Sequence, residues 1–329
     1  MIPLVYVEES VRNHPRTESI LARHPRASVV PIERYGSIFN HSQQNFRLQK
    51  QRPALILANK HGHFVQPAPD AYGVGGNHNW YFSHMLNCLY DCRYCFLQGM
   101  YRSAPYLVFV NFESFLDDID SKIETGKQNW FFSGYDADSL ALEPVTGFVA
   151  NALPFFATRP DAWLELRTKS TQVRQLLEHD PLSNVVTAFS YTPEATWKAT
   201  EHKVPSIEKR IQAMKKLAEN GWIVALRFDP LIEQAGFNDA YSALFEQIFS
   251  QVPESMIHSA TIGPLRMPKQ FHRTMENLYP EESLFVSGLA QRNSMVSYPA
   301  EREREMIEWA TDELEKHLPG NKIFPNLPS

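Results

Sequence analysis

Three cysteines stand close together in the segment Cys88-Leu-Tyr-Asp-Cys92-Arg-Tyr-Cys95, and the chain has no others. Three thiolates with this C-x3-C-x2-C spacing can bind three irons of a [4Fe–4S] cube and leave the fourth iron without a protein ligand. An open metal position is typical of a catalytic site rather than a structural one. S-adenosylmethionine (SAM) can fill that position through its amino and carboxylate groups. An electron from the cluster then releases a 5′-deoxyadenosyl radical, which abstracts a hydrogen atom.

Other interpretations of the same cysteines stay open. A structural zinc ion would take the three thiolates and a fourth ligand, either His84 or a carboxylate. A redox dithiol formed by Cys92 and Cys95 would leave Cys88 without a role. The cysteines can also be buried residues without a function. A zinc or iron–sulfur protein that serves as a non-enzymatic scaffold is the alternative to an enzyme. The triplet favours the iron–sulfur interpretation because it follows the first strand of a βα series.

That series is read from short apolar segments that alternate with helical ones. The predicted strands are Trp80–Leu86, Leu107–Phe112, Trp130–Ser133, Ala162–Arg167, Val185–Tyr191, Ile223–Phe228 and Ile257–Ile262. Helical patterns are clearest at Phe115–Thr125, Ser206–Asn220 and Ala240–Gln251. Strands rich in Val, Ile, Phe and Trp that alternate with helices indicate a parallel sheet.

The fold class predicted from this alternation is α/β, a partial (β/α)6 barrel of the TIM type. Residues 1–75 are expected to form an N-terminal accessory region, 76–290 the barrel, and 291–329 a C-terminal element that includes an amphipathic helix over Ala300–His317. Polar residues follow three of the strands, in RTKS (Arg167–Ser170), FSYT (Phe189–Thr192) and RFDP (Arg227–Pro230). The carboxyl ends of barrel strands carry the chemistry, so these are candidate site residues.

Composition sets further limits. With 43% apolar residues and a net charge of −5, the chain can bury a full core and is not strongly basic. No apolar run approaches the ~18 residues of a membrane helix, and no secretory signal is apparent at the N-terminus. The expectation is a cytoplasmic protein without a membrane partner. Clustered cysteines, rather than cysteines spread along the chain, agree with a reducing compartment.

The segment CLYDCRYCFLQGMY resembles the cluster loop of the spore photoproduct lyase group within the radical SAM superfamily. The upstream ANKHGHFVQPAP (Ala58–Pro69) is similar to a lead-in of that group, and LRTKS, FSYT and DADSLALE (Asp136–Glu143) resemble its strand-end motifs. The resemblance covers roughly residues 55–315. It implies a radical SAM enzyme of lyase type with a [4Fe–4S] cluster and SAM as cofactors.

The resemblance also implies roles for individual residues. Cys88, Cys92 and Cys95 would be the cluster ligands. Tyr94 would lie beside the adenine of SAM, and Phe96 stands where the family typically has a tyrosine. Lys169 would contact SAM, Ser190 would lie near its ribose or methionine end, and Arg167 would hold a carboxylate. Ammonium and hydroxyl groups suit these partners chemically.

One departure from the family concerns the return of a hydrogen atom. Spore photoproduct lyase uses a fourth cysteine, just before a Thr-Ser-Asp run, to give hydrogen to the product radical. This chain has no fourth cysteine, and alignment of DADSLALE places Tyr135 at that position. A phenol can donate a hydrogen atom, so Tyr135 is the candidate catalytic residue. Its alternative is an aromatic side chain that fills space beside the strand.

Expected partners follow from the resemblance and from charged residues near the predicted strand ends. Reduction of the cluster calls for an external electron donor of the flavodoxin or ferredoxin type. A nucleic acid, such as DNA carrying a photolesion, is one candidate substrate. The basic run Pro264–Arg273 after the last barrel strand would suit a phosphate backbone, although a solvated helix start explains it as well. Asp229, at the end of another strand, is a further candidate for the pocket wall.

Overall fold

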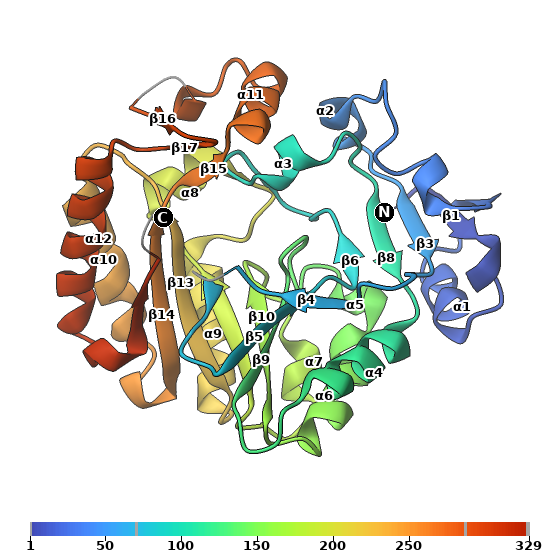
Figure 1. Ribbon diagram of the computed structural model, residues 1–329, viewed down its shortest axis with the longest axis horizontal. Helices are drawn as coiled ribbons and strands as arrows, with labels where there is room; N and C mark the ends of the chain where they lie inside the picture. The colour runs from blue at the N-terminus through green and yellow to red at the C-terminus, as the bar shows by residue number, and fades with distance from the viewer. Residues whose placement is uncertain (1, 70–71, 286–287, 327–329) are drawn as a thin grey trace.

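Two curved sheets and their helices make up the fold, seen in a computed structural model that describes residues 2–69, 72–285 and 288–326 (Figure 1). The larger sheet has the order β18-β14-β13-β11-β10-β9-β5-β4, and all neighbouring pairs are parallel except β4 with β5. Its strands are β4 (Val65–Pro67), β5 (His78–Phe82), β9 (Asn129–Ser133), β10 (Ala162–Thr168), β11 (Val185–Ser190), β13 (Ile223–Leu231), β14 (Ile257–Pro264) and β18 (Ile323–Pro325). This curled parallel sheet is the partial barrel that the sequence predicted.

The central strands β9 and β11 of the barrel are mostly apolar because both of their faces are covered. Every residue of β9 and of β11 is buried, as expected for parallel strands enclosed by helices. The helices between barrel strands include α4 (Phe112–Lys122), α5 (Glu143–Thr146), α6 (Phe148–Ala157), α7 (Arg174–Leu177), α8 (Glu194–Thr200), α9 (Ile207–Glu219) and α10 (Phe237–Phe249). Figure 1 shows α9 and α10 outside the curved sheet, with α12 (Ala300–Glu315) beside α10.

Helix α9 shows how local sequence sets an element. The Ser206 hydroxyl accepts a hydrogen bond from the Lys209 N–H at 3.4 Å and caps the first turn. Ile207, Ile211 and Met214 then lie on one buried face at helical spacing. The helix ends before Gly221, whose positive φ of 84° suits glycine. The sequence prediction of a helix over Ser206–Asn220 is confirmed within a residue at each end.

A second, smaller sheet contains strands that the sequence analysis assigned to the barrel. Its order is β2-β1-β3-β8-β6, formed by β1 (Leu4–Glu8), β2 (Ser28–Ile32), β3 (Leu55–Ala58), β6 (Met85–Leu86) and β8 (Tyr106–Phe109). The predicted strand Leu107–Phe112 is therefore wrong as a barrel strand, because β8 pairs with β3. The predicted strand Trp80–Leu86 is also split, since β5 belongs to the barrel and β6 pairs with β8.

The cysteine segment runs between these two sheets. Helices α1 (Pro15–Ala22) and α2 (Phe46–Gln49) belong to the N-terminal side, and α3 (Leu97–Met100) follows the cysteines and packs on α11 (Lys269–Leu278). A three-stranded sheet of β15 (Arg266–Pro268), β17 (Met295–Ser297) and β16 (Ala290–Arg292) adjoins α11. Two short strands, β7 (Asp91–Cys92) and β12 (Glu201–His202), complete the fold.

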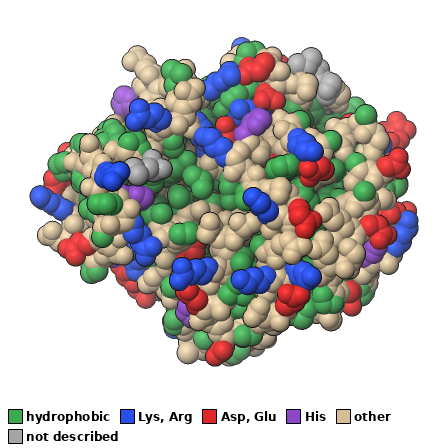
Figure 2. All heavy atoms as spheres, turned by 180° about the vertical axis from the view of Figure 1, so that it is seen from behind, with side chains coloured by type: hydrophobic (Ala, Val, Ile, Leu, Met, Phe, Trp, Pro, Cys, Tyr) green, Lys and Arg blue, Asp and Glu red, His purple; other side chains and the backbone are tan. Residues whose placement is uncertain are grey.

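The surface is charged but mixed in sign. On the face turned away from the view of Figure 1, lysines and arginines are interspersed with acidic side chains (Figure 2). Over the described ranges, no helix combines the length and apolar character needed to span a bilayer.

Candidate active site

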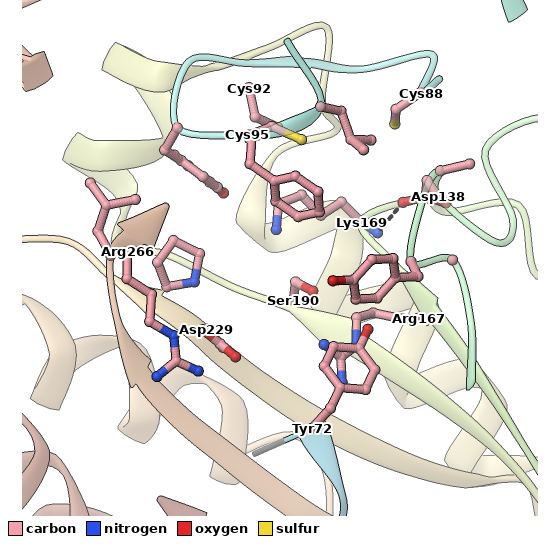
Figure 3. A pocket seen from close by; sticks show the side chains of 18 of the residues that line it. Tyr72, Cys88, Cys92, Cys95, Asp138, Arg167, Lys169, Ser190, Asp229 and Arg266 are labelled. Carbon is pink, nitrogen blue, oxygen red and sulfur yellow. Dashed lines mark hydrogen bonds between the residues drawn. The ribbon is translucent and has the colours of Figure 1, made fainter. Parts of the chain in front are cut away.

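A cavity of about 480 Å³ opens at the carboxyl ends of the barrel strands and is bordered by the cysteine loop (Figure 3). The nine residues to which the sequence analysis gave individual roles all line it: Cys88, Cys92, Tyr94, Cys95, Phe96, Tyr135, Arg167, Lys169 and Ser190. Of the wider strand-end candidates, Thr168, Asp229 and Pro230 also line the cavity, whereas Ser170, Phe189, Tyr191, Thr192, Arg227 and Phe228 are not part of its lining. Parallel strands bring their carboxyl ends to the same edge, which explains how residues from β9, β10 and β11 meet the loop. The structure therefore brings the predicted residues together.

The cysteine loop is fixed by pairing across the barrel opening. Cys92 in β7 lies opposite Glu201 in β12, and the Arg93 N–H donates to the Thr200 carbonyl at 2.8 Å. On the other side of the loop, the Lys50 ammonium donates to the Cys88 carbonyl. The loop is thus held both by a barrel segment and by the N-terminal side of the molecule.

The three thiols suit a thiolate-held cluster. None is in a disulfide. Burial by itself opposes ionisation, since it raises the pKa of each thiol, that of Cys88 to about 12. The charges of Lys50 and Lys169 act in the opposite direction on the pKa of Cys95, since they stabilise negative charge on its sulfur. The Tyr90 N–H also donates to Cys88 Sγ at 3.4 Å. Buried sulfurs with cations and an N–H donor nearby match the requirements of iron–sulfur ligands.

His84, which the sequence analysis considered as a fourth ligand of a zinc ion, packs against aromatic side chains instead. Its ring stacks on Phe148 at 4.0 Å and meets Phe112 edge-on, so it is part of an aromatic cluster. Across the described part of the chain, no three His, Cys, Asp or Glu side chains are close enough to hold a single metal ion. Figure 3 shows Cys88 set apart from Cys92 and Cys95 along the loop.

Lys169 reaches toward the cluster loop from the end of β10. Its ammonium nitrogen is 3.9 Å from a Glu201 carboxylate oxygen and 5.6 Å from the centre of the Tyr94 ring. Glu201 also accepts from the Tyr94 hydroxyl and forms a fully buried ion pair with Arg210 at 2.8 Å. Although burial raises the pKa of Glu201, the charges of Arg210 and Lys169 outweigh this effect and lower it.

Ser190 is tied to the same network from the end of β11. Its carbonyl accepts a hydrogen bond from Arg210 at 2.7 Å, while its side chain lines the cavity. Lys169 and Ser190 therefore come from adjacent strands and are both positioned by the Glu201–Arg210 pair. This pair carries no motif, and we did not identify it from the sequence.

Arg167 faces the opposite wall of the cavity. Its guanidinium lies 4.2 Å from the centre of the Tyr72 ring and pairs with Glu165 at 3.0 Å (Figure 3). Glu165 is shared with the buried Arg227. Burial raises the pKa of Glu165, but the charges of Arg227 and Arg167 together outweigh it and set that pKa at about 2. Arg167 thus places a positive charge at the cavity wall, while its guanidinium group also pairs with the Glu165 carboxylate.

Tyr135 follows β9 and stands among aromatic rings. The distance between ring centroids is 4.5 Å to Tyr81, 5.6 Å to Tyr72 and 5.9 Å to Phe96. Burial is the main cause that raises the pKa of Tyr135, so the phenol keeps its proton at neutral pH. Phe96 lies between this group and Phe271, on which it stacks at 6.5 Å.

Three further residues of the cavity come from motifs that the sequence analysis noticed, and only Asp138 was not considered there as a single position. Asp138, inside DADSLALE, accepts the Lys169 backbone N–H at 2.6 Å and the Thr168 hydroxyl at 2.7 Å, so it shapes the end of β10. Asp229, a predicted candidate, lines the cavity and accepts from Asn326 at 3.1 Å. Of the basic run after β14, Arg266 lines the cavity.

A curled parallel half-barrel with a three-cysteine loop at its open end is the architecture of radical SAM proteins. The family model for spore photoproduct lyase matches residues 80–323, and the chain belongs to that family.

Similarity to individual proteins is distant. The spore photoproduct lyase of Bacillus subtilis (strain 168) is 26% identical over 202 residues, and that of Geobacillus sp. (strain Y412MC61) is 24% identical over 204 residues. Each match covers 60% of this chain and 59% of the relative. A solved structure of a spore photoproduct lyase mutant with bound AdoMet and dinucleoside spore photoproduct has a TM-score of 0.85 at 17% identity. It covers 100% of this chain and 99% of that one, which confirms the fold.

Proposed function

We propose that this protein is a radical SAM enzyme that acts on a nucleic-acid photolesion or a chemically similar dinucleotide. One observation supports this most strongly: the three cysteines share a single cavity with Lys169, Ser190, Arg167 and Tyr135. A scaffold protein would not need cationic, hydroxyl and phenol groups around the same metal-binding loop.

Cys88, Cys92 and Cys95 would hold a [4Fe–4S] cluster. When bound, the cluster and SAM supply a 5′-deoxyadenosyl radical that abstracts a hydrogen atom from the substrate. Lys169 would bind the SAM carboxylate, Ser190 would donate to its ribose or methionine end, and the rings of Tyr94 and Phe96 would flank its adenine. The Glu201–Arg210 pair orients Lys169 and Ser190 for these contacts.

Tyr135 would return a hydrogen atom to the substrate radical. Its side chain lines the cavity, and the chain contains no cysteine beyond the three of the cluster loop. In this step the phenolic O–H bond breaks, a C–H bond forms in the product, and Tyr135 is left as a neutral phenoxyl radical. A protonated phenol is required, which agrees with the raised pKa of this group.

The substrate class is proposed from the side chains of the cavity wall that contains Arg167. Arg167 and Arg266 bring positive charge to the cavity, and Tyr72 and Phe271 bring aromatic faces. Guanidinium groups suit phosphate and aromatic rings suit bases. The related enzyme structure holds a dinucleoside spore photoproduct, so this compound is the first substrate to test. An external flavodoxin or ferredoxin type of donor would supply the electron.

The test is anaerobic. The protein is reconstituted with iron and sulfide, reduced with dithionite and mixed with SAM, and 5′-deoxyadenosine is quantified beside Cys92→Ala. Formation by the wild type alone, with Cys92→Ala still folded by circular dichroism, supports the proposal. A complete cluster with SAM and dinucleoside spore photoproduct but no deoxyadenosine contradicts it and favours a binding protein.

The role of Tyr135 has its own measurement. Because its hydroxyl proton exchanges with solvent, product formed in D2O gains one deuterium on carbon. Tyr135→Phe is expected to lose this label and to accumulate side products, while deoxyadenosine release continues. A product that stays free of deuterium in the wild type would exclude Tyr135 as the donor.

A further inference from the structure

Two exposed apolar side chains lie close to the cysteine loop. Among the described residues, four large apolar side chains are exposed, and two of them are Leu48 of α2, with 63% of its surface exposed, and Met100 of α3, with 37%. Helix α3 directly follows the last cysteine, and Figure 1 shows α2 and α3 at the same end of the molecule. Single exposed apolar side chains are ordinary, but two beside one loop favour a contact surface.

Short connections join both helices to the loop. Lys50, directly after α2, donates from its ammonium to the Cys88 carbonyl, and the exposed Lys203 donates to the Lys50 carbonyl at 2.9 Å. The Gln49 side chain of α2 accepts from the N–H of Ala104, shortly after α3, at 2.9 Å. A protein bound over α2 and α3 would therefore lie next to the loop that carries the three cysteines.

Positive charge surrounds these two side chains. Residues 1–60 hold nine Lys and Arg against four Glu, although the whole chain has a net charge of −5. Arg52 follows α2, Arg102 follows α3, and Lys203 lies beside Lys50; all three are exposed. Within the described part of the chain, none of the three forms an ion pair.

The acidic side chains beside this surface already have basic partners. Glu281 pairs with Arg47, and both Asp91 and Glu282 pair with Arg93, at 2.7 Å and 2.8 Å. The positive charge of the other cations is therefore not cancelled locally. We call the exposed residues of this surface the α2–α3 patch: Arg47, Leu48, Arg52, Met100, Arg102 and Lys203.

The α2–α3 patch is separate from the cavity. None of its six residues belongs to the described cavity lining, so a partner bound there would leave the cavity open for SAM and substrate. A nucleic-acid backbone would be contacted mainly by polar and charged groups. Protein interfaces, in contrast, are enriched in Met and Arg, and contacts between redox proteins are small. The combination of Leu48 and Met100 with exposed cations thus favours an acidic protein.

We propose that the α2–α3 patch is the docking surface for the electron donor, a small acidic protein that carries one electron. This inference rests on the proposed function. In the transfer the donor is oxidised by one electron and the cluster is reduced by one electron, and no bond is broken. The cations steer the acidic donor toward the cysteine loop, and Leu48 and Met100 are covered in the complex.

Docking is tested by isothermal titration calorimetry of cluster-reconstituted protein with oxidised flavodoxin, in the absence of SAM. Arg52→Glu and Leu48→Ser should each weaken binding by roughly tenfold or more. Arg26→Glu and Val29→Ser are the matched controls, because they make the same changes at exposed positions elsewhere in the N-terminal region. Both should bind as the wild type does. Added salt should weaken wild-type binding, since it screens exposed charges.

Two results of this titration would overturn the proposal: a wild type that does not bind flavodoxin, or patch variants that bind as tightly as the controls. A third concerns nucleic acid. If Arg52→Glu weakens binding of a UV-irradiated oligonucleotide but not of flavodoxin, the patch is a nucleic-acid surface and the proposal is wrong.

Electron delivery is measured as the rate of 5′-deoxyadenosine formation with two reductants. With reduced flavodoxin limiting, Arg52→Glu should be slower than the wild type by roughly tenfold. With dithionite, a small reductant that needs no docking surface, the two proteins should react at the same rate. An equal loss with both reductants would contradict docking, because it would show that the substitution disturbs the fold or the cavity.

The two measurements separate failure of docking from failure of the proposed function. Flavodoxin binding that depends on Arg52 and Leu48 supports the docking surface even if dithionite and SAM give no deoxyadenosine. Deoxyadenosine formed with dithionite, by a protein that flavodoxin neither binds nor reduces, supports the proposed function and rejects the docking surface.

Discussion

The carboxylate of Glu201 lies 3.9 Å from the ammonium nitrogen of Lys169, and Glu201 itself stands opposite Cys92 in the β7–β12 pair. One buried acid therefore connects the cysteine loop to the end of β10. The same acid pairs with Arg210 of α9, whose guanidinium also holds the Ser190 carbonyl. The proposed cofactor contacts thus share one structural support.

Removal of the Lys169 charge should weaken SAM binding while leaving the fold intact. For Lys169→Ala we expect the affinity of the reconstituted protein for SAM to fall roughly 10- to 100-fold. This corresponds to the loss of one hydrogen bond to a charged group, which contributes about 1.5–3 kcal/mol. Arg210 still neutralises Glu201, so thermal unfolding should change little. Isothermal titration calorimetry with SAM makes the measurement. The exposed Lys198→Ala is the control, and equal affinity in both variants would exclude Lys169 as a SAM contact.

Breaking the buried ion pair should instead destabilise the protein. Arg210→Met leaves Glu201 without its main partner, and a buried charge that loses its partner costs about 3–5 kcal/mol. Urea unfolding followed by circular dichroism gives the free energy. Lys209→Met, at an exposed position on the same helix, should cost far less. A loss below about 1 kcal/mol in Arg210→Met would mean that the pair does not stabilise the site.

Acid stability should depend on Glu165. Its pKa in the folded state is about 2, below the ordinary value of 4.5. A carboxyl group whose pKa is lowered by folding stabilises the protein above its unfolded pKa, and this contribution is lost as pH falls toward the folded value. The free energy of unfolding should therefore decline from about pH 5 toward pH 2.

The variant Glu165→Gln isolates that contribution. It cannot ionise, so its free energy of unfolding should fall less steeply over the same pH range than that of the wild type. Parallel pH profiles, obtained from urea unfolding at pH 6 and pH 3, would show that Glu165 is not the titrating group.

A glycine in α3 should control the position of α11 and hence of the cavity wall. A Cβ atom at Gly99 would stand 2.4 Å from the Phe271 carbonyl oxygen and 2.7 Å from its Cα, both backbone atoms. Gly99→Ala must displace α11, so we expect a loss of about 1–3 kcal/mol in unfolding free energy. Phe271 lines the cavity, so the KM for the dinucleoside should also rise.

The control for this substitution is Gly36→Ala, where a Cβ would meet nothing within 4 Å. Activity and unfolding are measured for both variants. If Gly99→Ala matches Gly36→Ala in both respects, the contact between α3 and α11 does not set the cavity wall.

Much of the candidate site follows from the sequence because its signals are local. The cysteine spacing is contained within eight residues, and ligands on one short loop converge wherever that loop lies. Polar residues at the carboxyl ends of β10, β11 and β13 were recognised because parallel strands place these ends at one edge. Alternating strands and helices identified the partial barrel for the same reason, since each βα unit is a local pattern.

Tertiary structure alone decided which strands pair and what supports the site. The segment around β8 has the apolar character of a barrel strand, yet its partner is β3 of the other sheet. Tyr94 and Glu201 are 107 residues apart, and nothing in either segment indicates the other. Strand pairing and buried ion pairs depend on packing across the whole molecule. The sequence of a short apolar strand, or the position of a single acidic residue, is compatible with many partners, and only the folded chain selects one of them.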